Sequence, residues 1–200
     1  MKNLKTGTFS ILAISSTSQS MGVAVASGSP SVGQRVPHAQ PGVGVIATQA
    51  YTRVAYGIQG LNLLSQGLSP QQTLHTLLEE DPNPESRQVG IMDFQRRKAD
   101  FTGSNVLPFH GEVEGENYLV LGNLLTEQEV VNGMASAFEH SSGELAWRMI
   151  RALQAGSKRG GDQRGEISAA LVVVGMEEVE LKISVYMHDS PIEELHRHLR

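Results

Sequence analysis

The apolar segments of this chain are short and bounded by turn residues, and this limits the folds open to it. Apolar runs at residues 9–14 and 21–26 flank a polar Ser-, Thr- and Gln-rich segment at 15–20. Runs of this length between turn residues are typical of buried strands. No run approaches the ~20 apolar residues of a membrane-spanning helix. We therefore predict an N-terminal hairpin and no membrane partner.

The rest of the chain alternates blocks of strands with pairs of helices. We expect strands at 43–49, 87–94, 98–102, 118–121, 167–174 and 179–186, and helices at 54–64, 70–79, 126–140, 144–154 and 191–199. The Gly-rich segments 28–41 and 156–165 indicate irregular structure. Several strands are apolar at every position, which indicates that both of their faces are covered. The sequence predicts an α+β domain, a four-layer αββα sandwich of two mainly antiparallel sheets flanked by helix pairs.

Three local signals place the ends of helices. Ser69 before Pro70 predicts an N-cap, and Thr126 with Glu129 predicts a capping box. A proline-rich segment at 81–84 ends the second helix. The acidic residues 79–81 there predict a solvated helix end.

Composition excludes several classes of function. The formal net charge of -5 over 200 residues argues against a nucleic-acid partner. The chain has no cysteine, which excludes disulfides, thiolate metal sites and a Cys nucleophile. His196 and His198 are two residues apart on a predicted helix and do not share a face, so they predict no metal site. We expect a cytoplasmic protein without cofactor or metal.

Thr8 opens the first predicted strand directly after Gly7. Cleavage of the Gly7–Thr8 bond would give Thr8 a free amine, so one residue would carry both a nucleophilic hydroxyl and a base. Residues 1–7 would then be a leader and residues 8–200 a single domain. Without cleavage, Thr8 is an ordinary β-branched strand residue. The sequence leaves both interpretations open.

Other polar residues at turns and strand ends are candidates for the same site. The glycine-rich loop at 160–165 places Asp162 and Arg164 where they could orient a nucleophile or bind a carboxylate, or form a surface ion pair. Asn123 follows a strand, and its amide could donate to an oxyanion or stabilise a turn. At strand ends, polar side chains line a pocket or satisfy the backbone. The candidate binding residues are Ser27, Thr48, Gln49, Arg87, Arg164 and Ser168.

A series of motifs runs through nearly the whole chain. In order they include Phe-Ser-Ile at 9–11, Gly-Val-Ala-Val-Ala-Ser at 22–27, Gly-Val-Gly at 42–44, Ala-Thr-Gln-Ala at 47–50, Arg-Gln-Val-Gly at 87–90, Gly-Asn at 122–123, Gly-Gly-Asp at 160–162, Arg-Gly at 164–165 and Ser-Ala-Ala-Leu at 168–171. Together they resemble the prokaryotic family known as domain of unknown function 1028. That family in turn resembles the N-terminal nucleophile (Ntn) hydrolases.

The resemblance implies an αββα fold and amide-bond hydrolysis by an N-terminal Thr, Ser or Cys. Proteasome-like members of that superfamily place a lysine near the nucleophile, whereas this sequence has no lysine between Lys5 and Lys98. Members of the family often begin Met-Thr-Phe-Ser-Ile. Here six extra residues, ending in Thr6-Gly7, lie between the initial Met and Thr8, so either Gly7–Thr8 is cleaved, or translation starts elsewhere, or the nucleophile is unused.

Two hypotheses follow. The first is an Ntn-type amidohydrolase that cleaves a small amide or peptide substrate, with Thr8, Asn123 and Asp162 as its catalytic residues. The second is a non-catalytic Ntn-fold module that binds a metabolite or assembles into oligomers. In either case we expect a homo-oligomer.

Overall fold

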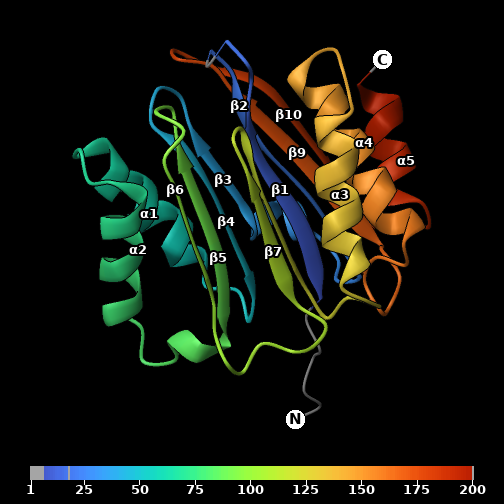
Figure 1. Ribbon diagram of the computed structural model, residues 1–200, viewed down its shortest axis with the longest axis horizontal. Helices are drawn as coiled ribbons and strands as arrows, with labels where there is room; N and C mark the ends of the chain where they lie inside the picture. The colour runs from blue at the N-terminus through green and yellow to red at the C-terminus, as the bar shows by residue number, and fades with distance from the viewer. Residues whose placement is uncertain (1–6, 18, 200) are drawn as a thin grey trace.

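Two antiparallel sheets lie face to face, and helices cover their outer faces (Figure 1). The structure, a computed structural model, describes residues 7–17 and 19–199. The predicted αββα sandwich is confirmed, with β-strand and helix blocks in the expected order. Of the predicted leader at 1–7, all but Gly7 lies outside the described residues.

The strands are divided between a six-stranded large sheet and a four-stranded small sheet. The large sheet has the order β10-β9-β2-β1-β8-β7, with β1 (Thr8–Ile14), β2 (Met21–Ser27), β7 (Gly111–Gly115), β8 (Tyr118–Asn123), β9 (Ser168–Val174) and β10 (Val179–Val185). The small sheet has the order β3-β4-β5-β6, with β3 (Pro37–Gln40), β4 (Gly44–Ala50), β5 (Arg87–Asp93) and β6 (Lys98–Thr102).

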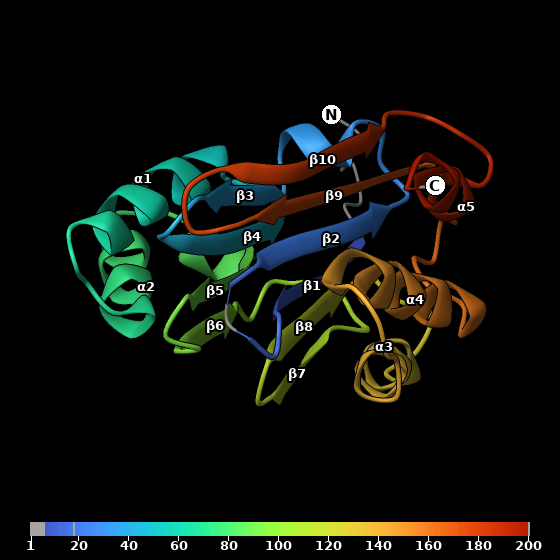
Figure 2. The ribbon, with the colours of Figure 1, turned by 90° about the horizontal axis from the view of Figure 1, so that it is seen from above.

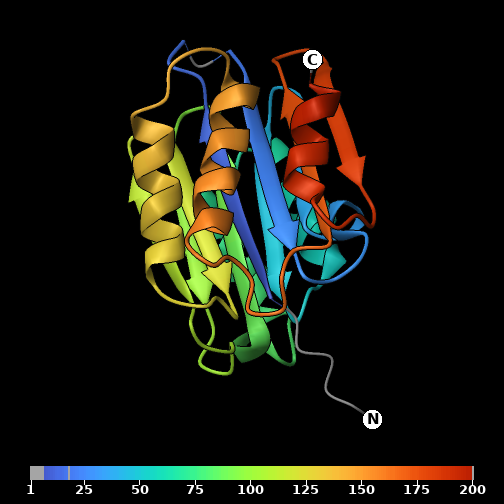
Figure 3. The same ribbon diagram turned by 90° about the vertical axis from the view of Figure 1, so that its right-hand side faces the viewer.

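Each sheet has its own helical layer (Figures 2 and 3). The helices α3 (Glu129–Glu139), α4 (Leu145–Lys158) and α5 (Pro191–His198) lie over the large sheet. The helices α1 (Val54–Ser65) and α2 (Pro70–Glu79) lie over the small sheet. Short 3₁₀ turns lie at Val32–Gln34 and Pro84–Ser86. Among the described residues, no helix has the length and apolar character needed to cross a bilayer.

Three apolar clusters hold these layers together. One lies between the sheets and includes Leu12, Val25 and Met92. Another joins the large sheet to α3, α4 and α5, and the third joins the small sheet to α1 and α2. Alternate residues of the inner strands enter clusters on opposite faces, which is why these strands are apolar throughout.

The largest differences from the predicted elements occur at sheet edges. β3 and β7 were not expected, since segment 28–41 suggested irregular structure and 111–115 is acidic at alternate positions. Both are edge strands, which need few apolar residues because one side has no neighbouring strand. α4 also runs to Lys158, into the segment expected to be a loop.

The helix caps gave one correct and one wrong prediction. Ser69 caps α2 through a reciprocal capping box with Gln72, and Pro70 occupies the first turn. The Thr126 cap is wrong, because α3 begins at Glu129 and the Thr126 hydroxyl donates to the carbonyl of Arg159 instead.

Candidate active site

A row of four polar side chains crosses the large sheet where β1 begins. Thr8 lies opposite Asn123 in β8, and Ser27 in β2 lies opposite Ser168 in β9. The β1–β2 register, in which Phe9 pairs with Ala26, places Thr8 beside Ser27. The residues two positions from Asn123, Ser27 and Ser168 enter the cluster between the sheets, and Ser10, two positions from Thr8, donates to Gln49 of the small sheet, so the whole row faces the small sheet. We call Asn123, Thr8, Ser27 and Ser168 the polar row; all four are buried.

The carbonyl oxygen of Gly7 lies against this row. The Thr8 Oγ1 lies 2.5 Å from it, the Ser27 Oγ donates to it at 2.6 Å, and the Arg164 Nη2 donates at 2.9 Å. The Thr8 Oγ1 is also 3.1 Å from the Ser27 Oγ. Hydrogen bonds from a hydroxyl and a cation withdraw electrons from a carbonyl and make its carbon more electrophilic. The Thr8 hydroxyl therefore lies next to a polarised carbonyl.

Arg164 is held in this position by Asp162. Its Nη2 donates to the Asp162 Oδ2 at 2.7 Å, and its Nε donates to the Oδ1 at 2.9 Å. The backbone N–H of Gly28 donates to the same Oδ2 at 2.7 Å. The Asp162 side chain is 0% exposed and the Arg164 side chain 25% exposed. This arrangement fixes both the carboxylate and the guanidinium beside Gly7.

The loop that carries Asp162 depends on its glycines. Gly160 and Gly161 have φ values of 100° and 54°, a region that side-chain-bearing residues rarely occupy. Asp162 then forms an isolated bridge with Leu125, just beyond β8. Its backbone N–H donates to the Glu166 Oε1 at 2.9 Å. The glycine-rich sequence thus brings the loop back to the end of the large sheet.

Behind Thr8, a chain of neutral side chains links the two sheets. Ser10 donates to the Gln49 Oε1 at 2.7 Å, and the Gln49 Nε2 donates to the Gln88 Oε1 at 2.8 Å. The Asn123 Nδ2 donates to the same Gln88 oxygen at 3.0 Å. The Gln88 Nε2 donates back to the carbonyl of Gly122 at 2.9 Å. We call Ser10, Gln49, Gln88 and Asn123 the amide chain; it joins β4 and β5 of the small sheet to β1 and β8 of the large sheet.

Gln88→Ala is expected to lower the free energy of unfolding by about 2 kcal/mol. The substitution leaves buried donors and acceptors of the amide chain without partners, at ~1–3 kcal/mol for each unsatisfied group. Urea unfolding followed by circular dichroism measures the loss. Gln95→Ala, at an exposed position in the β5–β6 turn, is the matched control and is expected to be neutral. Equal unfolding free energies for the two variants would show that the amide chain does not stabilise the folded protein.

Neighbouring candidates in the small sheet point in opposite directions. Gln49 and Gln88 face the large sheet, whereas Thr48 and Arg87 face the helices. The Thr48 hydroxyl donates to the carbonyl of Arg53, and Arg87 binds Asp81 and the carbonyl of Tyr51. The hydrogen bonds of Thr48 and Arg87 are therefore made to residues outside the polar row.

Ser168 contributes to the site indirectly. Its hydroxyl donates to the carbonyl of Ser29 at 2.6 Å, and the Ser29 hydroxyl accepts from the Arg164 Nη1 at 3.0 Å. Ser10 and Ser29 were not singled out from the sequence, whereas Gln88 was noted beside Arg87 as a polar residue at the start of a strand. A hydroxyl inside the apolar run of β1, two residues after Thr8, is the signal that could have identified Ser10.

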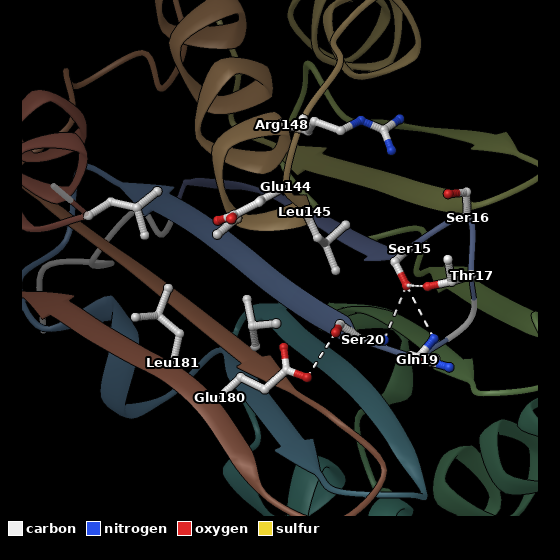
Figure 4. Close-up of a pocket in the computed structure, with 14 residues that line it drawn as sticks. Ser15, Ser16, Thr17, Gln19, Ser20, Glu144, Leu145, Arg148, Glu180 and Leu181 are labelled. Carbon is white, nitrogen blue, oxygen red and sulfur yellow. Dashed lines mark hydrogen bonds between the residues drawn. The ribbon is translucent and has the colours of Figure 1, made fainter.

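A hollow of about 560 Å³ lies at the other end of the large sheet (Figure 4). It is lined by the segment between β1 and β2, the start of α4 and the start of β10. Its polar groups bind one another, as in the bond from Ser20 to the Glu180 Oε1 at 2.8 Å. β1 separates this hollow from Thr8 by roughly 20 Å, at ~3.3 Å per residue, so the two are separate places.

Within residues 7–17 and 19–199, no group of three or more His, Cys, Asp or Glu side chains lies close enough to hold a metal ion. The charged pair beside Thr8 is Asp162 with Arg164.

Comparison with known proteins places the chain in a family. The model described as "Family of unknown function (DUF1028)" matches residues 8–195. The crystal structure of a Silicibacter pomeroyi protein of that family matches with a TM-score of 0.90 and 29% identity, covering 96% of this chain and 88% of that one. Anbu (ancestral beta-subunit) from Yersinia bercovieri matches with a TM-score of 0.46 and 11% identity, covering 96% and 92%. No curated protein matches the chain. The family match spans β1 to α5 and includes every residue of the polar row, and the chain therefore belongs to the DUF1028 family of unknown function.

Proposed function

We propose that this protein is an Ntn-type amidohydrolase that exposes Thr8 by cleaving its own Gly7–Thr8 bond and then hydrolyses a small amide or peptide. One observation carries the proposal: the Gly7 carbonyl accepts from Ser27 and Arg164 while the Thr8 hydroxyl lies 2.5 Å from its oxygen. The alternative, a non-catalytic binding module, does not require two hydroxyls and a guanidinium to converge on this one bond.

In the processing step, the Thr8 Oγ attacks the carbonyl carbon of Gly7. The C–O bond forms, the C–N bond breaks, and the hydroxyl proton passes to the departing nitrogen, which becomes the amine of Thr8. Charge that develops on the Gly7 oxygen is stabilised by the Ser27 hydroxyl and the Arg164 guanidinium. Water then cleaves the ester: its OH joins the Gly7 carbonyl and its proton returns to the Thr8 Oγ.

In the turnover reaction, the freed amine of Thr8 acts as the base. Arg164 does not take this role, because its guanidinium offers N–H donors and no acceptor. Arg164 instead stabilises the oxyanion of the substrate and takes the place of the absent lysine as the cation at the nucleophile. Asp162 acts through Arg164 by holding it in position.

Asn123 is assigned a different task from donating to the oxyanion. Its Nδ2 already donates to Gln88, while its Oδ1 is buried without a partner among the described residues. Directly opposed residues in antiparallel strands have Cβ atoms ~5 Å apart, so the Oδ1 is within reach of the freed amine at Thr8. Asn123 would accept a hydrogen bond from that amine and orient it after cleavage.

Intact-mass measurement and N-terminal sequencing of the purified full chain test the proposal. The expected product begins at Thr8 and hydrolyses at least one member of a panel of small amides. A chain that keeps the Gly7–Thr8 bond and hydrolyses none of them would refute it. Light scattering and cell fractionation test the homo-oligomer and the cytoplasmic location, both of which stay predictions.

Arg164→Met is expected to slow both processing and amide hydrolysis by about 10²–10³-fold. This is the usual effect of removing one donor from a developing oxyanion. Methionine keeps much of the side-chain volume and removes the charge and the donors. The time course of cleavage, followed by mass spectrometry, gives the rate. Arg151→Met, at an exposed position of α4, is the control and is expected to process normally. An unchanged rate in Arg164→Met would remove Arg164 from the mechanism.

A further inference from the structure

The space around the Gly7 Cα is closed on one side by Asp162. A Cβ atom added at position 7 would lie 2.7 Å from the Asp162 Oδ2 and 2.9 Å from its Oδ1 and Cγ. Real Cβ atoms essentially never make contacts under 3.0 Å. Any L-residue other than glycine would therefore have to displace the carboxylate.

The carboxylate is not free to move. Its Oδ2 accepts from the Arg164 Nη2 and from the backbone N–H of Gly28, each at 2.7 Å. Its Oδ1 accepts from the backbone N–H and the Nε of Arg164 at 3.0 Å and 2.9 Å. The side chain is also wholly buried. A shift large enough to admit a methyl group would break charge-assisted hydrogen bonds and disturb the guanidinium at the Gly7 carbonyl.

The same space must receive the acyl part of a substrate. Processing forms an ester between the Gly7 carbonyl and the Thr8 Oγ, and turnover forms an ester between the substrate carbonyl and the same oxygen. In both esters, the donors from Ser27 and Arg164 fix the position of the carbonyl. The α-carbon of the substrate acyl group therefore lies where the Gly7 Cα lies, against Asp162.

We propose that the acyl side of this site accepts glycyl groups and rejects acyl groups whose α-carbon carries an L side chain. The substrate class is therefore an amide of a glycyl-type carboxyl group, with an unbranched CH₂ next to the scissile carbonyl. This inference rests on the proposed function. Asp162 acquires a second role as the residue that determines specificity.

The first test compares amides that differ only at the α-carbon. Glycyl, L-alanyl and L-valyl amides of one fluorogenic arylamine are incubated with the processed protein. We expect kcat/KM for the glycyl amide to exceed that for the alanyl amide at least tenfold, with the valyl amide slower again. Equal values for glycyl and alanyl amides would overturn the inference and leave the proposed function standing.

The second test compares cleavage of the protein's own bond before Thr8 in variants of the preceding residues. Gly7→Ala in the full chain is expected to slow cleavage at least tenfold, whereas Thr6→Ala, one residue farther from the bond, is expected to process at the wild-type rate. Cleavage of Gly7→Ala at the wild-type rate would overturn the inference. Absence of processing and of amide hydrolysis in the wild type would instead refute the proposed function, and this inference with it.

A third measurement tests the steric conflict between a side chain at position 7 and Asp162 in a protein that does not cleave itself. In the Thr8→Ala background, where no cleavage is expected, Gly7→Ala is expected to lower the Tm by roughly 3 °C or more because the added methyl overpacks a buried site. An unchanged Tm would show that Asp162 yields freely, and would overturn the steric argument.

Discussion

Thr8→Ala is expected to leave the Gly7–Thr8 bond intact and to abolish amide hydrolysis. The substitution removes the attacking oxygen, and loss of a nucleophile typically costs roughly 10⁴-fold or more in rate. Among the described residues, the hydroxyl closest to the Gly7 carbonyl after Thr8 is that of Ser27, which already donates to the carbonyl oxygen. The Thr8 hydroxyl donates to the same oxygen, but only Thr8 also carries the nitrogen that departs, so its attack moves the acyl group within one residue through a five-membered ring.

Thr8→Ser is the informative companion to this variant. It keeps the hydroxyl and the amine and loses one methyl group, so processing and hydrolysis are expected to continue. Intact mass reports the cleavage, and circular dichroism with a thermal melt shows whether each variant is folded. If folded Thr8→Ala were cleaved after Gly7 at the wild-type rate, another group would be the nucleophile and the mechanism would fail.

Asp81→Ala is expected to lower the free energy of unfolding by about 3 kcal/mol or more. Asp81 is buried between α2 and β5 and accepts from the Arg87 Nε at 2.7 Å, the Arg53 Nη1 at 2.9 Å and the Tyr56 hydroxyl at 2.8 Å. Removing one partner from a buried ion pair leaves the remaining charges buried without a partner, which typically costs ~3–5 kcal/mol of stability.

The contribution of Asp81 should depend on pH in one direction. Hydrogen bonds from Arg87 hold the pKa of the Asp81 carboxyl well below its usual range in the folded protein. The unfolded chain therefore binds this proton first as the pH falls, and the stabilisation is complete only above the unfolded pKa of about 3.9. The difference in unfolding free energy between wild type and Asp81→Ala should stay constant from pH 7 to 5 and shrink below about pH 4.

Glu80→Ala provides the control for this prediction. Glu80 is the adjacent residue and is exposed, so its removal is expected to change stability by less than about 0.5 kcal/mol. Urea unfolding at several pH values compares the three proteins. A loss in Asp81→Ala no larger than that in Glu80→Ala, or a difference that grows as the pH falls below 4, would contradict the ion-pair account.

Asp81 also shows why local sequence patterns misjudge some residues. Its position in an acidic run before prolines predicted a solvated helix end, and the structure instead buries its side chain. The partner that buries it, Arg87, begins the next strand, and Arg53 precedes α1. The run of charges is visible in the sequence, whereas the pairing depends on how the small sheet packs against its helices.

The fold could be predicted largely because the apolar runs have the length of strands and the helices have clear boundaries. The sequence could not predict which polar residues of the small sheet point toward the large sheet. Thr48 and Gln49, like Arg87 and Gln88, are neighbours in strands that are buried on both faces. Such strands lack the apolar–polar alternation that reveals which face is which. The sequence therefore indicated the right pairs of positions without separating Gln49 and Gln88 from the outward-facing Thr48 and Arg87.

The glycine-rich loop at 160–165 could also be predicted only in part. The spacing of Asp162 and Arg164 suggested an ion pair, and the structure contains one. Its position beside Gly7 depends on the bridge between Asp162 and Leu125 and on a contact across most of the chain. Spacing within the loop carries no information about that contact.

The amide chain behind Thr8 has an electrical consequence. Ser10, Gln49, Gln88 and Asn123 carry no formal charge and do not titrate between acidic and alkaline pH. The connection between the sheets therefore keeps the same hydrogen-bond directions whatever the proton concentration, and it adds only small dipoles to the field at the Thr8 hydroxyl. Asp162 and Arg164 are the charged pair beside Thr8, so the side chains that join the two sheets behind Thr8 and the charged side chains next to its hydroxyl are separate sets of residues.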